Sequence, residues 1–292
     1  MASTRHGRSM LAALLLLFLA VEMGLPLLLA LGRNRLIFLP SAEPGPEAGL
    51  AYFPAAVEAR VVRIRRPDGR LLAAYDARLS GADQASAPVV LFAHGNAGNL
   101  FYRAPLLAFF VRHTGARTLL FDYSGYGGNA GRPSEEEVYR DGLAAYDHLV
   151  AEGVAPGRIV LYGESLGAAV ALEVASRRPV AGVVLQSSFA SLSSMARRLY
   201  PWLPLGPLLV RGAFPNAERL RRLEMPALVV HGTEDEIIPF AEGRSLHAAA
   251  PAGADFLPID GAGHNDLFEV GGEEYLRALG DRFRAWVEAA GL

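Results

Sequence analysis

The feature that most constrains the fold of this chain is an alternation of short apolar runs with longer helical patterns, which extends from residue 89 to the C-terminus. The apolar runs occupy residues 89–93, 118–121, 159–162, 180–185, 227–230 and 255–259. Helical patterns follow at 100–113, 135–151, 166–177, 240–250 and 273–289. Continuously apolar strands are expected where helices cover both faces of a parallel sheet. The alternation therefore predicts an α/β fold with a mostly parallel, doubly wound sheet.

Two segments depart from this alternation. Residues 57–66 and 70–79 flank a Pro-Asp-Gly turn with alternating polar and apolar residues, which predicts an antiparallel hairpin ahead of the parallel sheet. Residues 187–222 interrupt the strand–helix order with several prolines, leucines and a tryptophan. We expect this stretch to form a short cap-like insert within a catalytic domain that spans residues 57–292.

The N-terminus carries a separate signal. Residues 10–31 are almost continuously apolar and are flanked by arginines, and about 20 apolar residues suffice to cross a bilayer. Glu22 and Pro26 interrupt the run, but the leucines outweigh the cost of one carboxylate. We therefore predict a single-pass membrane anchor over residues 1–33 and a Pro/Gly-rich linker over 34–56. A cleaved signal peptide, leaving a secreted or periplasmic protein, and a buried core helix are the alternatives.

The strongest local motif is Gly163-Glu164-Ser165-Leu166-Gly167, which follows an apolar run and opens a helical one. A G-x-S-x-G sequence in this context predicts a nucleophile elbow, a sharp turn that exposes the serine hydroxyl above the sheet. Glycines on both sides are needed because the turn brings strand and helix close together. Ser165 is therefore the candidate nucleophile. The alternative is that this serine only caps the helix and has no catalytic role.

Two later loops supply partners for such a serine. His264 lies in a glycine-rich loop after the last apolar run, where an imidazole can reach both a serine and an acid. The loop after residues 227–230 contains Glu234, Asp235 and Glu236, any of which could be the acid. The order serine, acid, histidine is that of the α/β-hydrolase triad.

Two backbone N–H groups are predicted to bind the oxyanion of a tetrahedral intermediate. In this fold one belongs to the residue after the nucleophile, here Leu166, and the other to the loop after the third strand, here Asn96. Tyr126, in a second loop at the same edge, is predicted to line the substrate pocket. Asp122 in that loop is expected to brace it.

The composition excludes several classes of function. The chain has no cysteine, so disulfides, thiolate metal sites and a cysteine nucleophile are ruled out. A net charge of −2 gives no basis for nucleic-acid binding. We find no spacing of metal ligands, and we expect no cofactor. The oligomeric state is left open.

The motifs HGNAGN, DYSGYG, LYGESLG, HGTEDEIIP and GAGHND, in this order, resemble the α/β-hydrolase superfamily. They are similar to its membrane-associated α/β-hydrolase-domain proteins, which include protein depalmitoylases. The resemblance extends from about Asn34 to the C-terminus. It implies a catalytic triad of Ser165, His264 and Asp235, with Asp235 favoured over its acidic neighbours because it lies four residues after His231.

The motifs together predict a serine hydrolase that cleaves carboxylic esters or thioesters of a small or acylated substrate through an acyl-enzyme. A serine peptidase or aminopeptidase of the same fold is the alternative, with Glu164 as a candidate group for holding a substrate amine. A binding protein built on an inactive hydrolase fold is a third possibility.

Overall fold

The computed structural model describes residues 34–35, 37–81, 87–202 and 206–291. Its centre is an eight-stranded sheet with the order β10-β9-β8-β7-β4-β6-β3-β2. The strands from β6 to β10 along this order are parallel, and the β2–β3 hairpin and the β3–β6 pair are antiparallel. The predicted fold class and the N-terminal hairpin are therefore confirmed.

The strands lie close to the predicted apolar runs. Their bounds are β2 Val57–Arg65, β3 Leu71–Leu79, β4 Val89–Ala93, β6 Arg117–Phe121, β7 Ile159–Glu164, β8 Gly182–Gln186, β9 Ala227–Gly232 and β10 Asp255–Ile259. Every residue of β4, β7, β8 and β9 is buried. Helices therefore cover both faces of these central strands, which explains why their sequences are apolar without alternation.

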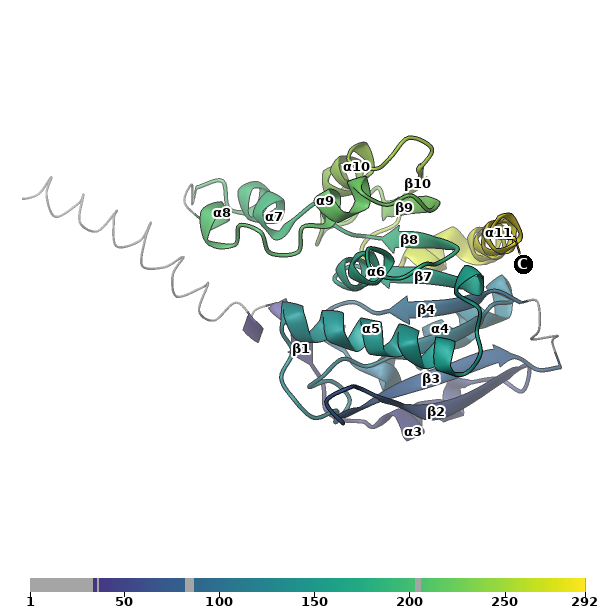
Figure 1. Ribbon diagram of the computed structural model, residues 1–292. Coiled ribbons are helices and arrows are strands. Elements are labelled where there is room, and N and C mark those ends of the chain that lie inside the picture. The colour runs from purple at the N-terminus through teal and green to yellow at the C-terminus, as the bar shows by residue number, and fades with distance from the viewer. Residues whose placement is uncertain (1–33, 36, 82–86, 203–205, 292) are drawn as a thin grey trace, which may run out of the picture.

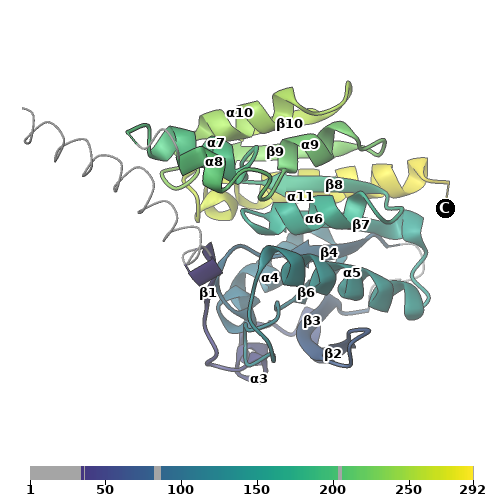
Figure 2. The same ribbon diagram turned by 60° about the vertical axis from the view of Figure 1, so that its left-hand side comes forward.

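Helices form a layer on each side of the sheet (Figures 1 and 2). On one side lie α5 Glu135–Ala151, α6 Gly167–Ala175 and α10 Phe240–Ala248; on the other lie α4 Leu100–Thr114 and α11 Leu267–Ala289. Successive residues of β4 alternate between the two cores: Leu91 packs under α5 and α6, whereas Phe92 packs under α4 and α11. The sheet is thus the shared wall of two hydrophobic layers.

The segment predicted as a linker, residues 34–56, is packed along the domain. Its strand β1 Leu39–Pro40 pairs with β5 Ala97–Gly98, and it continues into the short helices α3 Pro46–Gly49 and η2 Leu50–Tyr52. Phe38 is buried in the core. The Asn99 amide donates to the carbonyls of Ser41 and Pro44, so side-chain hydrogen bonds hold a stretch whose own sequence has no periodicity.

The insert between β8 and β9 contains α7 Leu192–Leu199, α8 Gly206–Leu209 and α9 Asn216–Arg221. It begins where β8 ends, and α7 and α8 lie at the same end of the molecule as β1 in both views (Figures 1 and 2). The rings of Phe214 in the insert and Phe38 beside β1 are 6.4 Å apart. The insert and the N-terminal strand therefore meet at the carboxyl edge of the parallel strands.

No helix within the described ranges is long and apolar enough to cross a membrane. The predicted anchor or signal segment, residues 1–33, lies outside those ranges.

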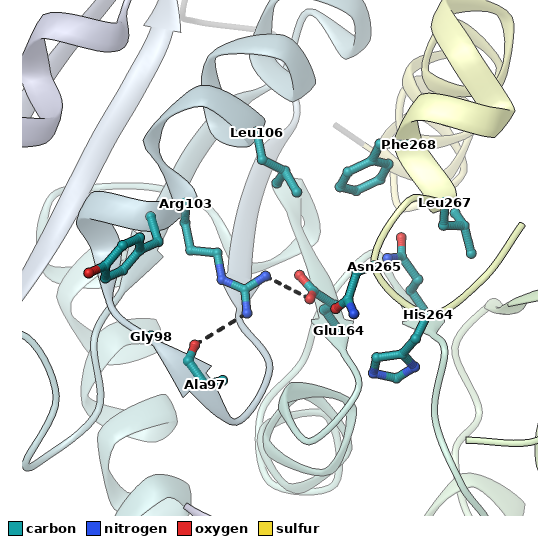
Figure 3. Close-up of a pocket in the computed structure, with 11 residues that line it drawn as sticks. Ala97, Gly98, Arg103, Leu106, Glu164, His264, Asn265, Leu267 and Phe268 are labelled. Atoms are coloured by element: carbon teal, nitrogen blue, oxygen red, sulfur yellow. Dashed lines mark hydrogen bonds and ion pairs between the residues drawn. The ribbon is translucent and has the colours of Figure 1, made fainter. Parts of the chain in front are cut away.

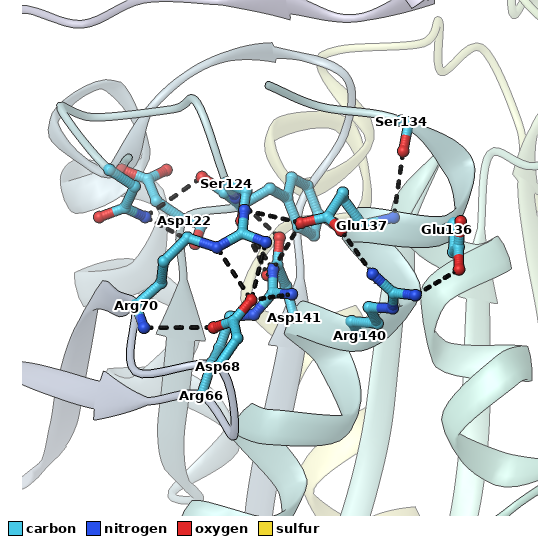
Figure 4. Close-up of polar contacts among 12 residues, drawn as sticks. Arg66, Asp68, Arg70, Asp122, Ser124, Ser134, Glu136, Glu137, Arg140 and Asp141 are labelled. Atoms are coloured by element: carbon cyan, nitrogen blue, oxygen red, sulfur yellow. Dashed lines mark hydrogen bonds and ion pairs between the residues drawn. The ribbon is translucent and has the colours of Figure 1, made fainter. Parts of the chain in front are cut away.

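A buried charge network joins the hairpin to α5 (Figure 4). The Arg66 guanidinium, which is 3% exposed, contacts the carboxylates of Asp141 at 2.5 Å and Glu137 at 2.9 Å. It also donates to the Ser124 hydroxyl, and Asp141 accepts from the Ser124 N–H. Removing one partner of such a pair leaves the other charge buried and uncompensated, so the hairpin end of the sheet should be sensitive to the loss of either side.

We expect Arg66→Met to lower the free energy of unfolding by about 3–5 kcal/mol, because the fully buried Asp141 carboxylate loses its partner. Arg222→Gln is the matched control: that arginine pairs with Glu218 at the exposed end of α9, and its loss should cost roughly 0.5 kcal/mol or less. Urea denaturation of both variants measures the difference. Equal effects would mean that the network is not a stabilising feature.

Candidate active site

The predicted nucleophile elbow is present in the structure. β7 ends at Glu164 and α6 begins at Gly167, with Ser165 in between at φ 55°, a backbone conformation that is uncommon for a residue with a side chain. A Cβ atom at Gly167 would lie 2.0 Å from the Ala93 carbonyl oxygen, and one at Gly163 would lie 2.4 Å from Ala168 Cα. Both glycines are therefore required for the close approach of strand and helix.

The elbow is held from outside by the neighbouring strand. The Ser165 N–H donates to the Gln186 carbonyl at the end of β8, and the Ser188 hydroxyl donates to the Ser165 carbonyl. These bonds fix the strained residue at both of its backbone polar groups. Such strain persists only where the surroundings determine it, and it is common at functional sites.

The structure brings Ser165, His264 and Asp235 together. His264 Nε2 lies 3.2 Å from Ser165 Oγ, and His264 Nδ1 lies 2.8 Å from Asp235 Oδ2. The three residues are 7–8% exposed, so the chain of contacts is largely shielded from water. A hydroxyl, an imidazole and a carboxylate in this order form the geometry of a serine-hydrolase triad.

Asp235 is held as an ionised acceptor. Its Oδ1 accepts the N–H groups of Ile237 and Ile238, and its Oδ2 lies 3.2 Å from His231 Nε2 as well as against His264. Burial opposes the charged form, but the hydrogen bonds from His231 and His264 outweigh it, so that the pKa of Asp235 lies well below its usual value. A permanent carboxylate here fixes the orientation of the His264 ring.

The neighbouring acids contact other groups. Glu236 accepts the backbone N–H of His264 at 3.2 Å and so braces the histidine loop. Glu234 is exposed, and its carboxylate makes no contact with His264. Of the three acids in this loop, Asp235 is thus the one placed against the imidazole.

The loop that carries Asn96 passes directly beside Ser165, since a Cβ atom at the preceding Gly95 would lie 3.5 Å from Ser165 Cβ. Asn96 is anchored through its own side chain, which donates to the Ile37 carbonyl, and its carbonyl accepts the Leu39 N–H. Leu166 directly precedes α6, where the helix dipole favours negative charge. Both residues are placed to act as oxyanion donors, and this role stays a prediction.

The expectation that Tyr126 lines the pocket needs correction. Tyr126 is 0% exposed, and its hydroxyl donates to the Asn96 carbonyl at 2.7 Å. It therefore braces the predicted oxyanion loop from behind. Asp122 has the bracing role expected for it: it is buried and accepts the Leu100 N–H at the start of α4.

A pocket of about 340 Å³ adjoins the triad (Figure 3). One side is apolar, with Leu106 of α4 and Leu267 and Phe268 of α11. The other side is polar and includes His264 and Glu164. This size and mixed lining are typical of small-molecule sites.

The sequence analysis missed an ion pair within this pocket. Arg103 in the first turns of α4 donates to Glu164 Oε1 at 2.7 Å, and its guanidinium also contacts the Ala97 carbonyl (Figure 3). Glu164 is 6% exposed, and its Oε2 has no hydrogen-bond partner among the described residues. Arg103 and Glu164 are 61 residues apart in the chain, so no local sequence pattern could predict that they pair in the pocket wall.

No group of three or more histidines and acids within the described ranges is arranged to hold a metal ion. The contacts among Ser165, His264 and Asp235 can support the chemistry of a hydroxyl activated by a general base. Fold and site together define an α/β-hydrolase.

Comparison with known proteins shows that the chain belongs to the α/β-hydrolase family. The model of the alpha/beta hydrolase family matches residues 90–223. The chain is 34% identical over 258 residues to the alpha/beta hydrolase domain-containing protein aho-3 of Caenorhabditis elegans, a match that covers 87% of this chain and 72% of that protein. It is 42% identical over 249 residues to the uncharacterized protein Rv2307c of Mycobacterium tuberculosis, with 85% of each chain covered.

Solved structures agree on the fold. A Pyrococcus furiosus esterase superposes with a TM-score of 0.63 at 20% sequence identity, covering 86% of this chain and 98% of that one. This likeness supports the α/β-hydrolase fold of the chain.

We expect Gly167→Ala to disrupt the elbow, because its Cβ would overlap the Ala93 carbonyl and force α6 away from β4. The cost should be about 1–3 kcal/mol of stability, together with slower labelling of Ser165 by a fluorophosphonate probe. Gly45→Ala is the control, since Gly45 has φ −69° and its Cβ would be 3.4 Å from the nearest atom, Glu47 Oε2. Unchanged stability and labelling of Gly167→Ala would contradict the packing argument.

Proposed function

We propose that this protein is a serine hydrolase that cleaves carboxylic ester or thioester bonds through an acyl-enzyme. The observation that carries the proposal is the pair of contacts from His264 to Ser165 at 3.2 Å and to Asp235 at 2.8 Å, set at a strained elbow. General-base activation of a serine requires this order of groups.

In the proposed mechanism His264 Nε2 takes the proton from Ser165 Oγ as the oxygen attacks the substrate carbonyl. Asp235 holds the Nδ1–H of the ring and stabilises the imidazolium that forms. The N–H groups of Leu166 and Asn96 stabilise the oxyanion. His264 then protonates the leaving alcohol or thiol, and in the second half-reaction it activates a water that releases the acid and restores Ser165.

The pocket beside the triad supports an acyl substrate with an apolar part. Leu106, Leu267 and Phe268 form a wall against which alkyl carbons can pack, and His264 stands at the edge of the same pocket. A volume of about 340 Å³ is at the lower end of the usual range for ligand sites. We infer that it accepts a short or medium acyl chain, or one end of a longer one.

The peptidase alternative loses its best candidate residue. An amine-binding carboxylate must keep a charge available for the substrate ammonium, and Glu164 is already paired with Arg103 inside the pocket. The pair is electrically neutral, so the pocket offers a cationic substrate little net attraction. This arrangement favours neutral acyl substrates.

We also propose that residues 1–33 tether the enzyme to a membrane as a single-pass anchor. The support is the apolar run at 10–31 with arginines on both flanks. Sequencing the N-terminus of the mature protein from membrane fractions tests this: an intact N-terminus is expected, and a new N-terminus near residue 33 in the soluble fraction would indicate a cleaved signal.

Ser165→Ala should abolish fluorophosphonate labelling and lower kcat/KM for p-nitrophenyl esters by roughly 10⁴–10⁶-fold, because the attacking oxygen is removed. Ser245→Ala, which removes an exposed hydroxyl bonded to the Ala241 carbonyl in α10, serves as the control and should retain labelling. A chain-length series of ester and thioester substrates on the wild type then identifies the acyl preference. Full esterase activity of Ser165→Ala would refute the proposed nucleophile.

Asp235→Asn should lower kcat by about 10⁴-fold while the folded structure is kept, since the amide no longer fixes the His264 ring as the carboxylate does. The same change tests the low pKa of Asp235. A depressed pKa stabilises the folded state above the unfolded pKa, near 3.8, and this contribution is lost as the pH falls further. The wild type should therefore lose stability relative to Asp235→Asn on acidification, as measured by urea unfolding at a series of pH values.

Substitution of Glu164 distinguishes the esterase from the peptidase alternative. We expect higher kcat/KM on p-nitrophenyl acyl esters than on aminoacyl p-nitroanilides, and we expect Glu164→Gln to change ester hydrolysis by less than about tenfold, or ~1.4 kcal/mol. A preference for the anilides that disappears in Glu164→Gln would establish the peptidase instead.

A further inference from the structure

Large apolar side chains are exposed at one end of the molecule. Among the described residues, those on β1, α7, α8 and the turn after α7 that are more than about four-tenths exposed are Leu39, Leu199, Tyr200, Trp202 and Leu208. Trp202 is 61% exposed, and its ring packs edge-on against Tyr200 at 6.1 Å. We call these five residues the exposed apolar face.

The exposed apolar face is assembled from two distant parts of the chain. β1 and the helices α7 and α8 lie at the same end of the sheet in both views (Figures 1 and 2), and the Phe38–Phe214 ring contact ties them together below the surface. The Ser193 hydroxyl of α7 donates to the carbonyls of Pro207 and Val210, which holds α7 against α8. The elements that carry the exposed apolar side chains are therefore packed against one another and against the domain.

On the insert side of this face the charged residues have a single sign. Residues 187–215 contain Arg197, Arg198 and Arg211 and no acidic residue, in a chain whose net charge is −2. Arg198 pairs with Glu242, whereas Arg197 and Arg211 are exposed and form no ion pair within the described part of the chain. The insert side of the exposed apolar face is thus bordered by uncompensated positive charge.

Aromatic rings with a polar edge, leucines and unpaired arginines are the residues that favour the boundary between lipid headgroups and acyl chains. The apolar run at 10–31 ends shortly before Arg35, and the described chain then enters β1 within this face. We propose that the exposed apolar face docks on the surface of an anionic lipid bilayer.

Docking at this face has a consequence for the catalytic loop. The Leu39 N–H donates to the Asn96 carbonyl, and Asn96 also holds the Ile37 carbonyl, so the lipid-facing strand and the predicted oxyanion loop are directly bonded. An acyl substrate that leaves the bilayer at this face arrives at the carboxyl edge of the sheet, where Ser165 lies.

The test uses the two tryptophans of the full chain. Trp202 lies in the exposed apolar face, whereas Trp286 packs against Gly182 in the core and is 8% exposed. The full-length protein is reconstituted into vesicles of phosphatidylcholine and phosphatidylglycerol whose acyl chains carry bromine, a contact quencher of tryptophan fluorescence. We expect strong quenching and a blue shift in the wild type, and loss of that quenchable component in Trp202→Phe.

Bromine in the acyl chains reports insertion, which tethering through the N-terminus alone does not produce. Quenching that is the same in the wild type and in Trp202→Phe would overturn the proposal. A blue shift of Trp202 that depends on protein concentration without lipid would also overturn it, because it would show a second copy of the chain on this face. Unchanged fluorophosphonate labelling of Trp202→Phe checks that the fold and the site are intact.

The arginines are tested separately. The double change Arg197→Gln, Arg211→Gln should shift the equilibrium between docked and undocked Trp202 by roughly 30-fold in anionic vesicles, since each arginine near such a surface contributes about 1 kcal/mol. Quenching in this variant should become insensitive to added salt. Unaltered quenching and salt dependence would overturn the electrostatic part of the proposal.

Discussion

The close approach of α6 to β4 is the constraint on which the rest of the site depends. With Gly167 lying against the Ala93 carbonyl, the chain must reverse at Ser165 within a few residues, and this forces the serine into a left-handed conformation. The bonds to Gln186 and Ser188 keep that conformation in place. The hydroxyl is consequently presented at a fixed point, toward which the loops after β9 and β10 can be built.

Those two loops place their groups by different means. The Asp235 loop is held by hydrogen bonds within the loop, because the Asp235 carboxylate accepts two of its backbone N–H groups. The His264 loop depends on its neighbours, since the Glu236 carboxylate holds the His264 N–H and the Ala262 carbonyl fits where Gly232 has no side chain. The acid is thus rigid by local bonding, and the imidazole is oriented by the acid.

Local signals in the sequence predicted most of the fold. The run at 255–259 coincides with β10, and the helix predicted at 135–151 coincides with α5 because an apolar stripe and the Ser134 cap define it. The last helix was predicted from residue 273, whereas α11 begins at Leu267 and is interrupted at Gly272, whose φ of 62° breaks the periodicity that marks a helix. Parallel strands in such a fold bring their carboxyl ends together, and this is why Ser165 and His264 could be predicted as partners, whereas Asp235 was chosen among three acids through the family resemblance.

Contacts between distant residues left no such signal. The packing of residues 34–56 depends on single side chains, Phe38 and Asn99, in a stretch whose prolines and glycines resemble those of a linker. The Arg103–Glu164 pair and the burial of Tyr126 likewise arise only when the sheet is assembled. The Arg103–Glu164 pair makes one wall of the pocket polar. The spacing of sequence motifs could not predict this property.

The hydrogen bond between Asn96 and Ile37 limits how far the loop beside Ser165 can lie from the N-terminal apolar run. Ile37 is six residue steps from Leu31, the end of the apolar run, and an extended chain spans at most about 3.6 Å per step, or roughly 22 Å in total. Whatever conformation that stretch adopts, the loop beside the nucleophile cannot move farther than this from the last apolar residue. Under the proposed membrane anchoring, the catalytic loop would therefore stay within this distance of the bilayer surface, and substrates at that surface would be the ones within its range.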